Sequence, residues 1–266
     1  MSLSCEQYHV AQLRIDDAPR EFVSNTVENG DVAETFVLQG SGHRLKKVSL
    51  WKLENSTGHS KNEAVTACVA SRQGSGPVLH DAWKTTDGYM FLEMDNYERS
   101  LAATMESIAK NQADHDGEAL AVDAALRRLY GLLASGTVCH RDLHPGNVVL
   151  KHTSCGMDAR VIDFSTSFYT GACASTDFDE LVTRMYEDWD KLSAGKFPTM
   201  PFINERFNTW QAEKHLRFQK YAKQDEEYRH KQAKLAAESA AIEKRIQVER
   251  QAAYDKWVLE NPSLAL

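Results

Sequence analysis

A short polar stretch near the middle of the chain carries the residue types that could perform chemistry. It runs from His140 to Asn147 and places the carboxylate of Asp142 and the amide of Asn147 on one loop. A second carboxylate, Asp163, follows a predicted β-hairpin of residues 148–162. Two acceptors that can hold a cation, beside a third that can accept a proton, are what phosphoryl transfer from a metal-bound nucleotide requires. The alternative is a purely structural role, because Asp and Asn are also common in ordinary turns.

The same residues resemble two motifs of the protein-kinase family, the catalytic loop H-R-D-x-x-x-x-N and the metal-binding D-F-G. Here the loop reads His-Arg-Asp-Leu-His-Pro-Gly-Asn, and the second motif reads Asp163-Phe164-Ser165. The resemblance implies ATP and Mg²⁺ as cofactors, with Asp142 as proton acceptor and Asn147 and Asp163 as magnesium ligands. It also implies an α+β, two-lobed fold with a small antiparallel β N-lobe and a reduced helical C-lobe.

Upstream of the loop, one lysine and one glutamate match the nucleotide-positioning pair of the family. Lys52 lies in an apolar run, residues 47–53, that predicts a strand and resembles the V-A-I-K segment. Glu63 lies in a predicted helix that has a face of small residues. The resemblance implies that Glu63 braces Lys52 while the lysine holds the α- and β-phosphates. For both residues the alternative is a solvated surface charge.

Two further stretches complete the predicted nucleotide site. Gly40 and Gly42 form a turn between predicted strands, where the lack of a side chain lets backbone N–H groups approach phosphate oxygens. Such a turn, taken alone, is more often an ordinary hairpin. The apolar run ending in Glu93 and Met94 resembles the fifth strand and hinge of the family, whose backbone would bond the edge of adenine.

Beyond Asp163 the chain departs from the family pattern. Ser165 replaces the glycine of D-F-G, no A-P-E follows, and a new helix is predicted near Thr176 with Asp177 or Asp179 as its N-cap. A long activation loop is therefore expected to be missing. This trimming resembles compact kinases, namely the KEOPS-complex and lipopolysaccharide types and the minimal kinases of pathogens and viruses.

Three functions remain open at this point. The first is a Ser/Thr protein kinase that moves the γ-phosphate of ATP to a protein hydroxyl, and Arg141 favours it. The second is a small-molecule kinase, because the stretch from His144 to Asn147 resembles aminoglycoside phosphotransferases. The third is a non-catalytic scaffold of the pseudokinase type, which is disfavoured because every catalytic position is filled.

Composition and periodicity divide the chain into four segments. Residues 1–30 are polar and predict a leader or an addition to a sheet edge, and residues 31–95 predict the N-lobe. Residues 96–210 predict the C-lobe, with a helix whose apolar stripe runs from Leu120 to Leu133. Residues 211–266 are rich in Lys, Glu, Gln, Arg and Ala. They predict a long charged helix or a hairpin packed on the C-lobe, with binding of a protein partner as the alternative role.

The totals exclude several classes of protein. With 266 residues, of which 42% are hydrophobic, the chain can bury a core. A net charge of -7 argues against nucleic acid as a partner, and no apolar run is long enough to predict a membrane span. The five cysteines are odd in number and form no C-x-x-C pair, which predicts reduced thiols. The predicted location is therefore the cytoplasm, or a host cytoplasm if the protein is a delivered effector or a viral protein.

Overall fold

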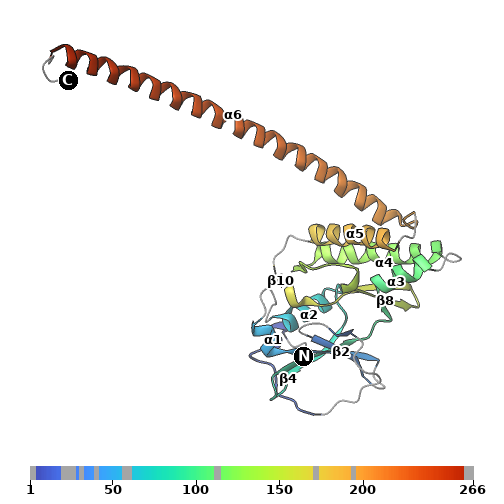
Figure 1. Ribbon diagram of the computed structural model, residues 1–266. Helices are drawn as coiled ribbons and strands as arrows, with labels where there is room; N and C mark the ends of the chain where they lie inside the picture. The colour runs from blue at the N-terminus through green and yellow to red at the C-terminus, as the bar shows by residue number, and fades with distance from the viewer. Residues whose placement is uncertain are drawn as a thin grey trace. The chain divides into compact units, whose positions relative to one another are not determined.

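The computed structural model describes residues 4–18, 28–29, 33–38, 42–55, 62–110, 115–169, 174–192 and 196–260. The chain forms two compact units, Met1–Asn208 and Thr209–Leu266. The first unit is α+β and contains a small antiparallel sheet and several helices (Figure 1). The second unit consists of the greater part of one helix. Within the part of the chain that the structure describes, every helix is too short or too polar to span a lipid bilayer.

The N-terminal half of the first unit is organised by a five-stranded antiparallel sheet. Its order is β1-β2-β3-β5-β4. Because successive residues of a strand face opposite sides, Val48 of β3 and Met90, Leu92 and Met94 of β5 fall on one face and form a core there. The five strands are β1 (Glu28–Asn29), β2 (Ala33–Val37), β3 (His43–Ser49), β4 (Leu79–Lys84) and β5 (Tyr89–Asp95).

The prediction of a strand over residues 47–53 is confirmed for residues 47–49 and wrong beyond Ser49. Strand β3 ends at Ser49, and helix α1 (Leu50–Asn55) follows it directly. Short apolar runs do not distinguish a strand from a helix by periodicity alone, and Leu-Trp-Lys-Leu is such a run. The side chain of Trp51 is 71% exposed, so the run does not supply a buried strand.

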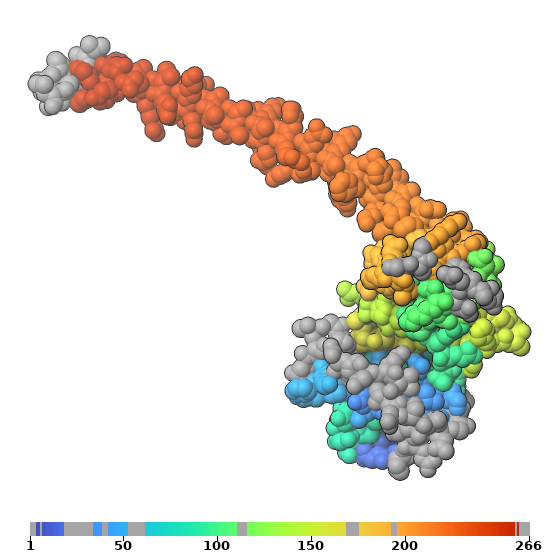
Figure 2. Space-filling model, turned by 45° about the vertical axis from the view of Figure 1, so that its right-hand side comes forward, coloured from blue at the N-terminus to red at the C-terminus, as the bar shows by residue number. Residues whose placement is uncertain are grey.

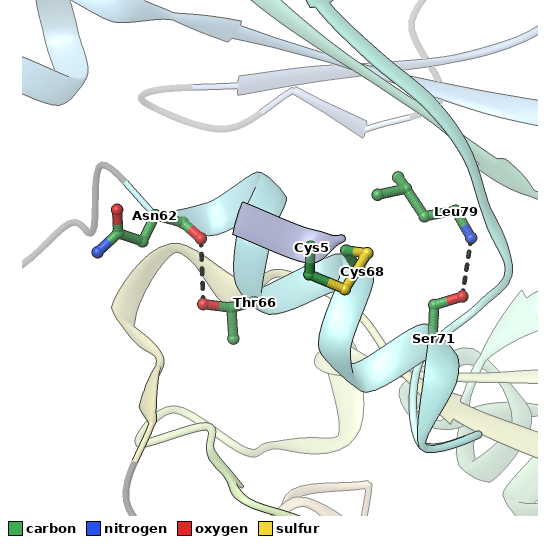
Figure 3. The surroundings of a disulfide bond; sticks show 6 residues. All are labelled: Cys5, Asn62, Thr66, Cys68, Ser71 and Leu79. Atoms are coloured by element: carbon green, nitrogen blue, oxygen red, sulfur yellow. Dashed lines mark hydrogen bonds between the residues drawn. A yellow bond between two sulfur atoms is a disulfide. The ribbon is translucent and has the colours of Figure 1, made fainter. Parts of the chain in front are cut away.

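Helix α2 (Glu63–Arg72) packs against the core face of the sheet and against η1 (Cys5–Tyr8), a short 3₁₀ helix. A disulfide joins Cys5 to Cys68 across this contact, with their Cα atoms 5.7 Å apart (Figure 3). The prediction of reduced thiols is therefore wrong for this pair. The two cysteines are separated by 63 positions, so only the fold reveals that they meet.

Part of the N-terminal segment extends the edge of the sheet. Ile15 forms a parallel bridge with Lys84 at the end of β4. The backbone N–H of Lys84 donates to the carbonyl of Arg14, and that of Asp16 donates to the carbonyl of Lys84, each at 2.9 Å. Of the two predictions for residues 1–30, the edge addition is confirmed for this stretch.

The rest of the first unit is mainly helical, with α3, α4 and α5 gathered at the end away from β2 and β4 (Figure 1). The apolar stripe of α4 is buried as predicted at Val122, Ala125, Leu126, Leu129 and Leu133, whereas Leu132 is only half-buried and Leu120 is 46% exposed. The helices are α3 (Leu101–Lys110), α4 (His115–Ser135), α5 (Ala174–Lys191) and α6 (Pro201–Glu260). They pack with β6 (Arg99–Ser100), β8 (Val148–Thr153) and β9 (Gly156–Val161), while β7 (Val138–Cys139) pairs with β10 (Phe168–Tyr169).

The second unit shows that the predicted hairpin is wrong. Helix α6 runs without a break through residues 209–260, because this stretch contains no Gly or Pro that would end it. Its side chains are exposed along the helix (Figure 2). Ion pairs at i,i+4 spacing, such as Glu213 with Arg217 and Glu249 with Arg245, support it instead of a buried face. Of the five apolar residues through which such a hairpin would pack on the C-lobe, four are exposed, namely Leu216, Phe218, Ile246 and Trp257. The side chain of the fifth, Leu259, lies outside the described residues.

Candidate functional site

Three charged side chains from distant parts of the chain meet at one point. Lys46 of β3 donates to the carboxylate of Glu63, the first residue of α2. The Nζ atom of Lys46 also lies 2.8 Å from Oδ1 of Asp163, which follows β9. Burial alone would lower the pKa of Lys46, but the charges of Glu63 and Asp163 outweigh this effect and raise it. Lys46 is therefore a fixed cation held between two carboxylates.

The geometry of β3 decides which lysine takes this position. Lys46 pairs with Leu92 of β5 and faces the side of the sheet on which α2 packs. Its neighbour Lys47 faces the opposite side, where its Nζ atom lies 3.7 Å from Glu34 and 4.1 Å from the ring centre of Tyr89.

The prediction that Lys52 pairs with Glu63 is wrong, because it assumed that the strand extends to residue 53, whereas β3 ends at Ser49. Lys52 lies on α1 with an exposed side chain, and its backbone N–H donates to the Ser49 hydroxyl at 3.3 Å. Glu63 instead braces Lys46, which lies six positions before Lys52 in the chain. Glu63 is only 2% exposed, so it is not a solvated surface charge.

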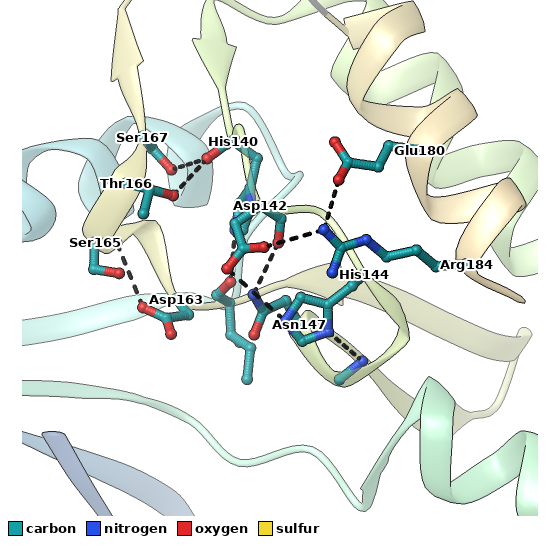
Figure 4. Close-up of polar contacts among 12 residues, drawn as sticks. His140, Asp142, His144, Asn147, Asp163, Ser165, Thr166, Ser167, Glu180 and Arg184 are labelled. Carbon is teal, nitrogen blue, oxygen red and sulfur yellow. Dashed lines mark hydrogen bonds and ion pairs between the residues drawn. The ribbon is translucent and has the colours of Figure 1, made fainter. Parts of the chain in front are cut away.

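The predicted loop is folded back onto the strand that leads to Asp163. The Nδ2 atom of Asn147 donates to the backbone carbonyl of Asp142 at 2.9 Å. The carbonyl of Asn147 accepts from the N–H of Ile162, also at 2.9 Å. His140 Nε2 lies 2.8 Å from the carbonyl of Ile162 (Figure 4). These bonds hold Asp142 and Asn147 beside the residue that precedes Asp163.

Asp163 adopts an unusual backbone conformation. Its φ of 62° lies in the left-handed region, and its carboxylate accepts from the N–H of Ser165 at 3.4 Å. Asp tolerates this region better than most residues because its short side chain can bond locally. Burial would raise the pKa of the Asp163 carboxyl, but the charge of Lys46 outweighs burial and holds the pKa well below its usual range. Asp163 is therefore ionised at neutral pH.

The start of the loop is anchored from α5. The Asp177 carboxylate accepts from the N–H of His140 at 2.7 Å and from that of Arg141 at 3.3 Å. The prediction that Asp177 or Asp179 caps this helix is wrong, because α5 already begins at Ala174. The ring of His140 is buried, and burial lowers its pKa, so the ring is neutral and serves packing.

The carboxylate of Asp142 is accessible, with its side chain 44% exposed. Two basic side chains lie near it (Figure 4). Nη2 of Arg184 on α5 lies 3.8 Å from Oδ1, and Nε2 of His144 lies 4.0 Å from Oδ2. Arg184 also bonds Glu180 at 2.6 Å. Sequence reasoning missed Arg184, because nothing in the acidic sequence of α5 marks it.

The remaining predicted residues are only partly brought to this point. Gly40 lies outside the described residues. Gly42 lies between β2 and β3 with φ of 69°, and its carbonyl accepts from the N–H of Asn96 at 3.1 Å. Met94 is buried on the same face of the sheet as Lys46, whereas the side chain of Glu93 lies on the other face. Of Glu93, only the backbone could make the predicted hydrogen bond to the edge of adenine.

The donor atoms at this point suit a small hard cation and a phosphate group. Asp163 and Asn147 offer carboxylate and amide oxygens, which are the atoms that Mg²⁺ prefers. The Nδ2 atom of Asn147 is already engaged, which orients its Oδ1 as the remaining acceptor. Lys46 supplies a cation and Asp142 an accessible base. Comparison of the chain with models of known protein families and with curated proteins found no match.

Proposed function

We propose that this protein is a phosphotransferase of the protein-kinase-like type, which moves the γ-phosphate of ATP to a Ser or Thr hydroxyl of a protein. The observation that carries the proposal is the contact of Lys46 with both Glu63 and Asp163. Protein kinases need a lysine of the third strand paired with a helix glutamate, and a metal-binding aspartate beside it. Lys46 is on the third strand of the sheet, and Glu63 is on the helix that packs against it.

The arrangement of the cores supports a two-lobed fold of this type. One buried cluster joins the five-stranded sheet to Ala64 of α2. A second and larger cluster joins α3, α4 and α5 to β8 and β9 and also includes Ala67 and Ala70 of α2. Lys46 extends from the first part, and Asp142, Asn147 and Asp163 belong to the second. We propose that the nucleotide binds where these two parts meet.

Each residue of the site has a role in this mechanism. Asp142 orients the acceptor hydroxyl and takes its proton as the oxygen attacks the γ-phosphorus. Lys46 binds phosphate oxygens of ATP, and Glu63 keeps its ammonium group in place. Asn147 and Asp163 would hold Mg²⁺, which neutralises charge on the phosphates when it is bound. Arg184 lies close enough to Asp142 to keep its carboxylate oriented.

A small-molecule kinase is the second candidate. His144 favours it, because its Nδ1 accepts from the N–H of Gly146 at 3.1 Å and so shapes the His-Pro-Gly-Asn turn beside Asp142. A non-catalytic scaffold is the third candidate. The accessible carboxylate of Asp142 and the ordered Lys46–Glu63 pair argue against it.

Labelled ATP separates the three candidates. The purified chain is incubated with Mg²⁺ and γ-labelled ATP, once with a cell lysate as a source of protein acceptors and once with a metabolite panel. Transfer to proteins supports the first function, and transfer to metabolites alone supports the second. Asp142→Asn serves as the inactive control in both arms. If neither arm gives labelled product and calorimetry detects no Mg-ATP binding, the proposal of a phosphotransferase fails.

A further inference from the structure

The geometry points to a binding site for a divalent transition ion of the zinc class, formed by His43, His80 and Asp95. One ligand atom from each of these residues lies within 4.8 Å of the other two. The residues come from three neighbouring strands, β3, β4 and β5. Two imidazoles and a carboxylate form a ligand set that Zn²⁺ accepts in proteins. This inference does not depend on the proposed function.

The site lies on the face of the sheet opposite to Lys46. His43 is three residues before Lys46 on β3, and it pairs with Asp95 across the ladder. Residues an odd number of positions apart face opposite sides of a strand, so His43 and Lys46 point away from each other. The two clusters of charged groups therefore do not share ligands.

A β-bulge directs His80 toward the cluster. In the β4–β5 ladder Leu79 pairs with Met94 and Asp81 pairs with Glu93, so His80 is the extra residue. Bulges redirect a side chain at the cost of local pairing and are frequent beside functional sites. As a result, Nε2 of His80 lies 2.7 Å from Oδ1 of Asp95, and its ring stacks on that of His43 with centroids 3.9 Å apart.

Glu93 is the positioning residue of this site. Its Oε1 lies 2.6 Å from Nδ1 of His43. Ligating histidines usually donate their second ring N–H to such a carboxylate, which fixes the ring and makes the ligand more basic. The cluster therefore contains an outer partner as well as its three ligands. His43 is 26% exposed and Asp95 33% exposed, so an ion can reach the site from solvent.

Binding requires the imidazole of His80 to turn out of its stack on His43, whose ring Glu93 holds in place. The planes of the two rings are inclined by only 14°, so their lone pairs cannot both point at one ion as they stand. Rotation about χ2 is inexpensive for His, because this torsion has broad minima. The strand backbones are fixed by the ladder, so closure needs movement of side chains only. Oxygen-preferring ions such as Mg²⁺ and Ca²⁺ would not favour two imidazoles.

The test titrates Co²⁺, a spectroscopic substitute for Zn²⁺, into the full chain after removal of metal by a chelator. We expect one equivalent to bind with the strong visible absorption of a tetrahedral Co²⁺ site, and Zn²⁺ but not Mg²⁺ to displace it. His80→Asn and Asp95→Asn abolish this absorption, and Glu93→Gln weakens binding about 10- to 100-fold. The matched control is His152→Asn, which changes an exposed histidine on β8 and leaves binding unchanged.

Two results would overturn the inference. One is the same Co²⁺ affinity and spectrum in the His80 and Asp95 variants as in the unaltered chain. The other is no binding of Co²⁺ or Zn²⁺ to the unaltered chain. Circular dichroism checks that the variants fold. If they do not, the imidazole NMR signals of the unaltered chain decide, because Zn²⁺ must shift those of His43 and His80 and not that of His152.

Discussion

Replacing Lys46 by Met is the most direct test of the candidate site. The change removes the ammonium group of Lys46 but keeps most of the length of its side chain. In the proposed mechanism it removes a preorganised cation from the phosphate oxygens. Loss of one such group commonly lowers kcat by about 10²–10³-fold, equivalent to roughly 2.7–4 kcal/mol. We expect a loss of phosphate transfer of this size.

The same change also lowers stability, and this effect must be separated from catalysis. Glu63 is 2% exposed, so Lys46→Met removes the cation that contacts this buried carboxylate. Breaking a buried pair in this way costs about 3–5 kcal/mol. Asp163 adds little to this cost, because its side chain is 41% exposed and solvent screens it. A domain is stable by only about 5–15 kcal/mol, so the single variant will be markedly destabilised.

The double variant Lys46→Met/Glu63→Gln resolves the two effects. In this double variant a neutral amide replaces the buried carboxylate, so we expect urea denaturation to show that most of the lost free energy of unfolding is restored. Phosphate transfer should stay low, because the cation is still missing. The assay is incorporation of labelled phosphate under conditions in which each variant is folded.

Two other lysines provide matched controls. Lys47→Met changes the adjacent residue on the opposite face of the same strand. Lys52→Met changes the exposed lysine on α1. Both variants should keep phosphate transfer within about 2-fold, since surface substitutions away from a site usually cost less than about 0.5 kcal/mol. A folded Lys46→Met variant with full activity, or an equal loss in Lys52→Met, would refute the reasoning.

Three further predictions concern separate parts of the molecule. Asp142→Ala should lower phosphate transfer by about 10²–10⁴-fold while Mg-ATP binding measured by calorimetry survives, and loss of both together would contradict its role as proton acceptor. Burial lowers the pKa of His140 in the folded chain, so on acidification this histidine is protonated in the unfolded chain before it is protonated in the folded one, and stability falls. His140→Gln should therefore make the fall in the free energy of unfolding less steep, as measured by urea denaturation between about pH 7 and 5. An unchanged slope would count against a neutral, buried ring. Without reductant, Cys5→Ser should lower the free energy of unfolding by about 2–4 kcal/mol, because the variant lacks the disulfide. With reductant, the variant and the unaltered chain should be about equally stable. Equal stability of the two proteins without reductant would disprove the disulfide.

Much of the fold could be predicted from local patterns. The apolar run from Tyr89 to Met94 predicts a strand, and Asp87-Gly88 predicts the hairpin before it, where Gly88 has φ of 87°. The turn at Cys155-Gly156 predicts the hairpin of residues 148–162, in which β8 and β9 pair. The spacing of apolar residues along α4 predicts its buried face. Each of these features depends on residues that are close together in the sequence.

The lysine of the site could not be found in this way. Lys46 and Lys47 are adjacent, and both are half-buried in the same strand. Only the register with β5 decides that Lys46 faces α2, and local patterns do not fix that register. Strand β3 begins at His43 and buries Leu45 on one face and Val48 on the other, so these two apolar residues show no simple alternation. The apolar run Leu-Trp-Lys-Leu of residues 50–53 instead led to a strand predicted too far toward the C-terminus.

Helix α2 links the stability of the first unit to the geometry of the candidate site. Glu63 at its start holds Lys46, and Cys68 lies five residues later on the same helix. At a rise of about 1.5 Å per residue, the disulfide constrains α2 within roughly 8 Å of the carboxylate along the helix axis. The helix is thus held by a covalent bond on one side and by a buried ion pair on the other. A change that lets α2 shift must therefore move Glu63 as well, and the position of the Lys46 ammonium group depends on Glu63.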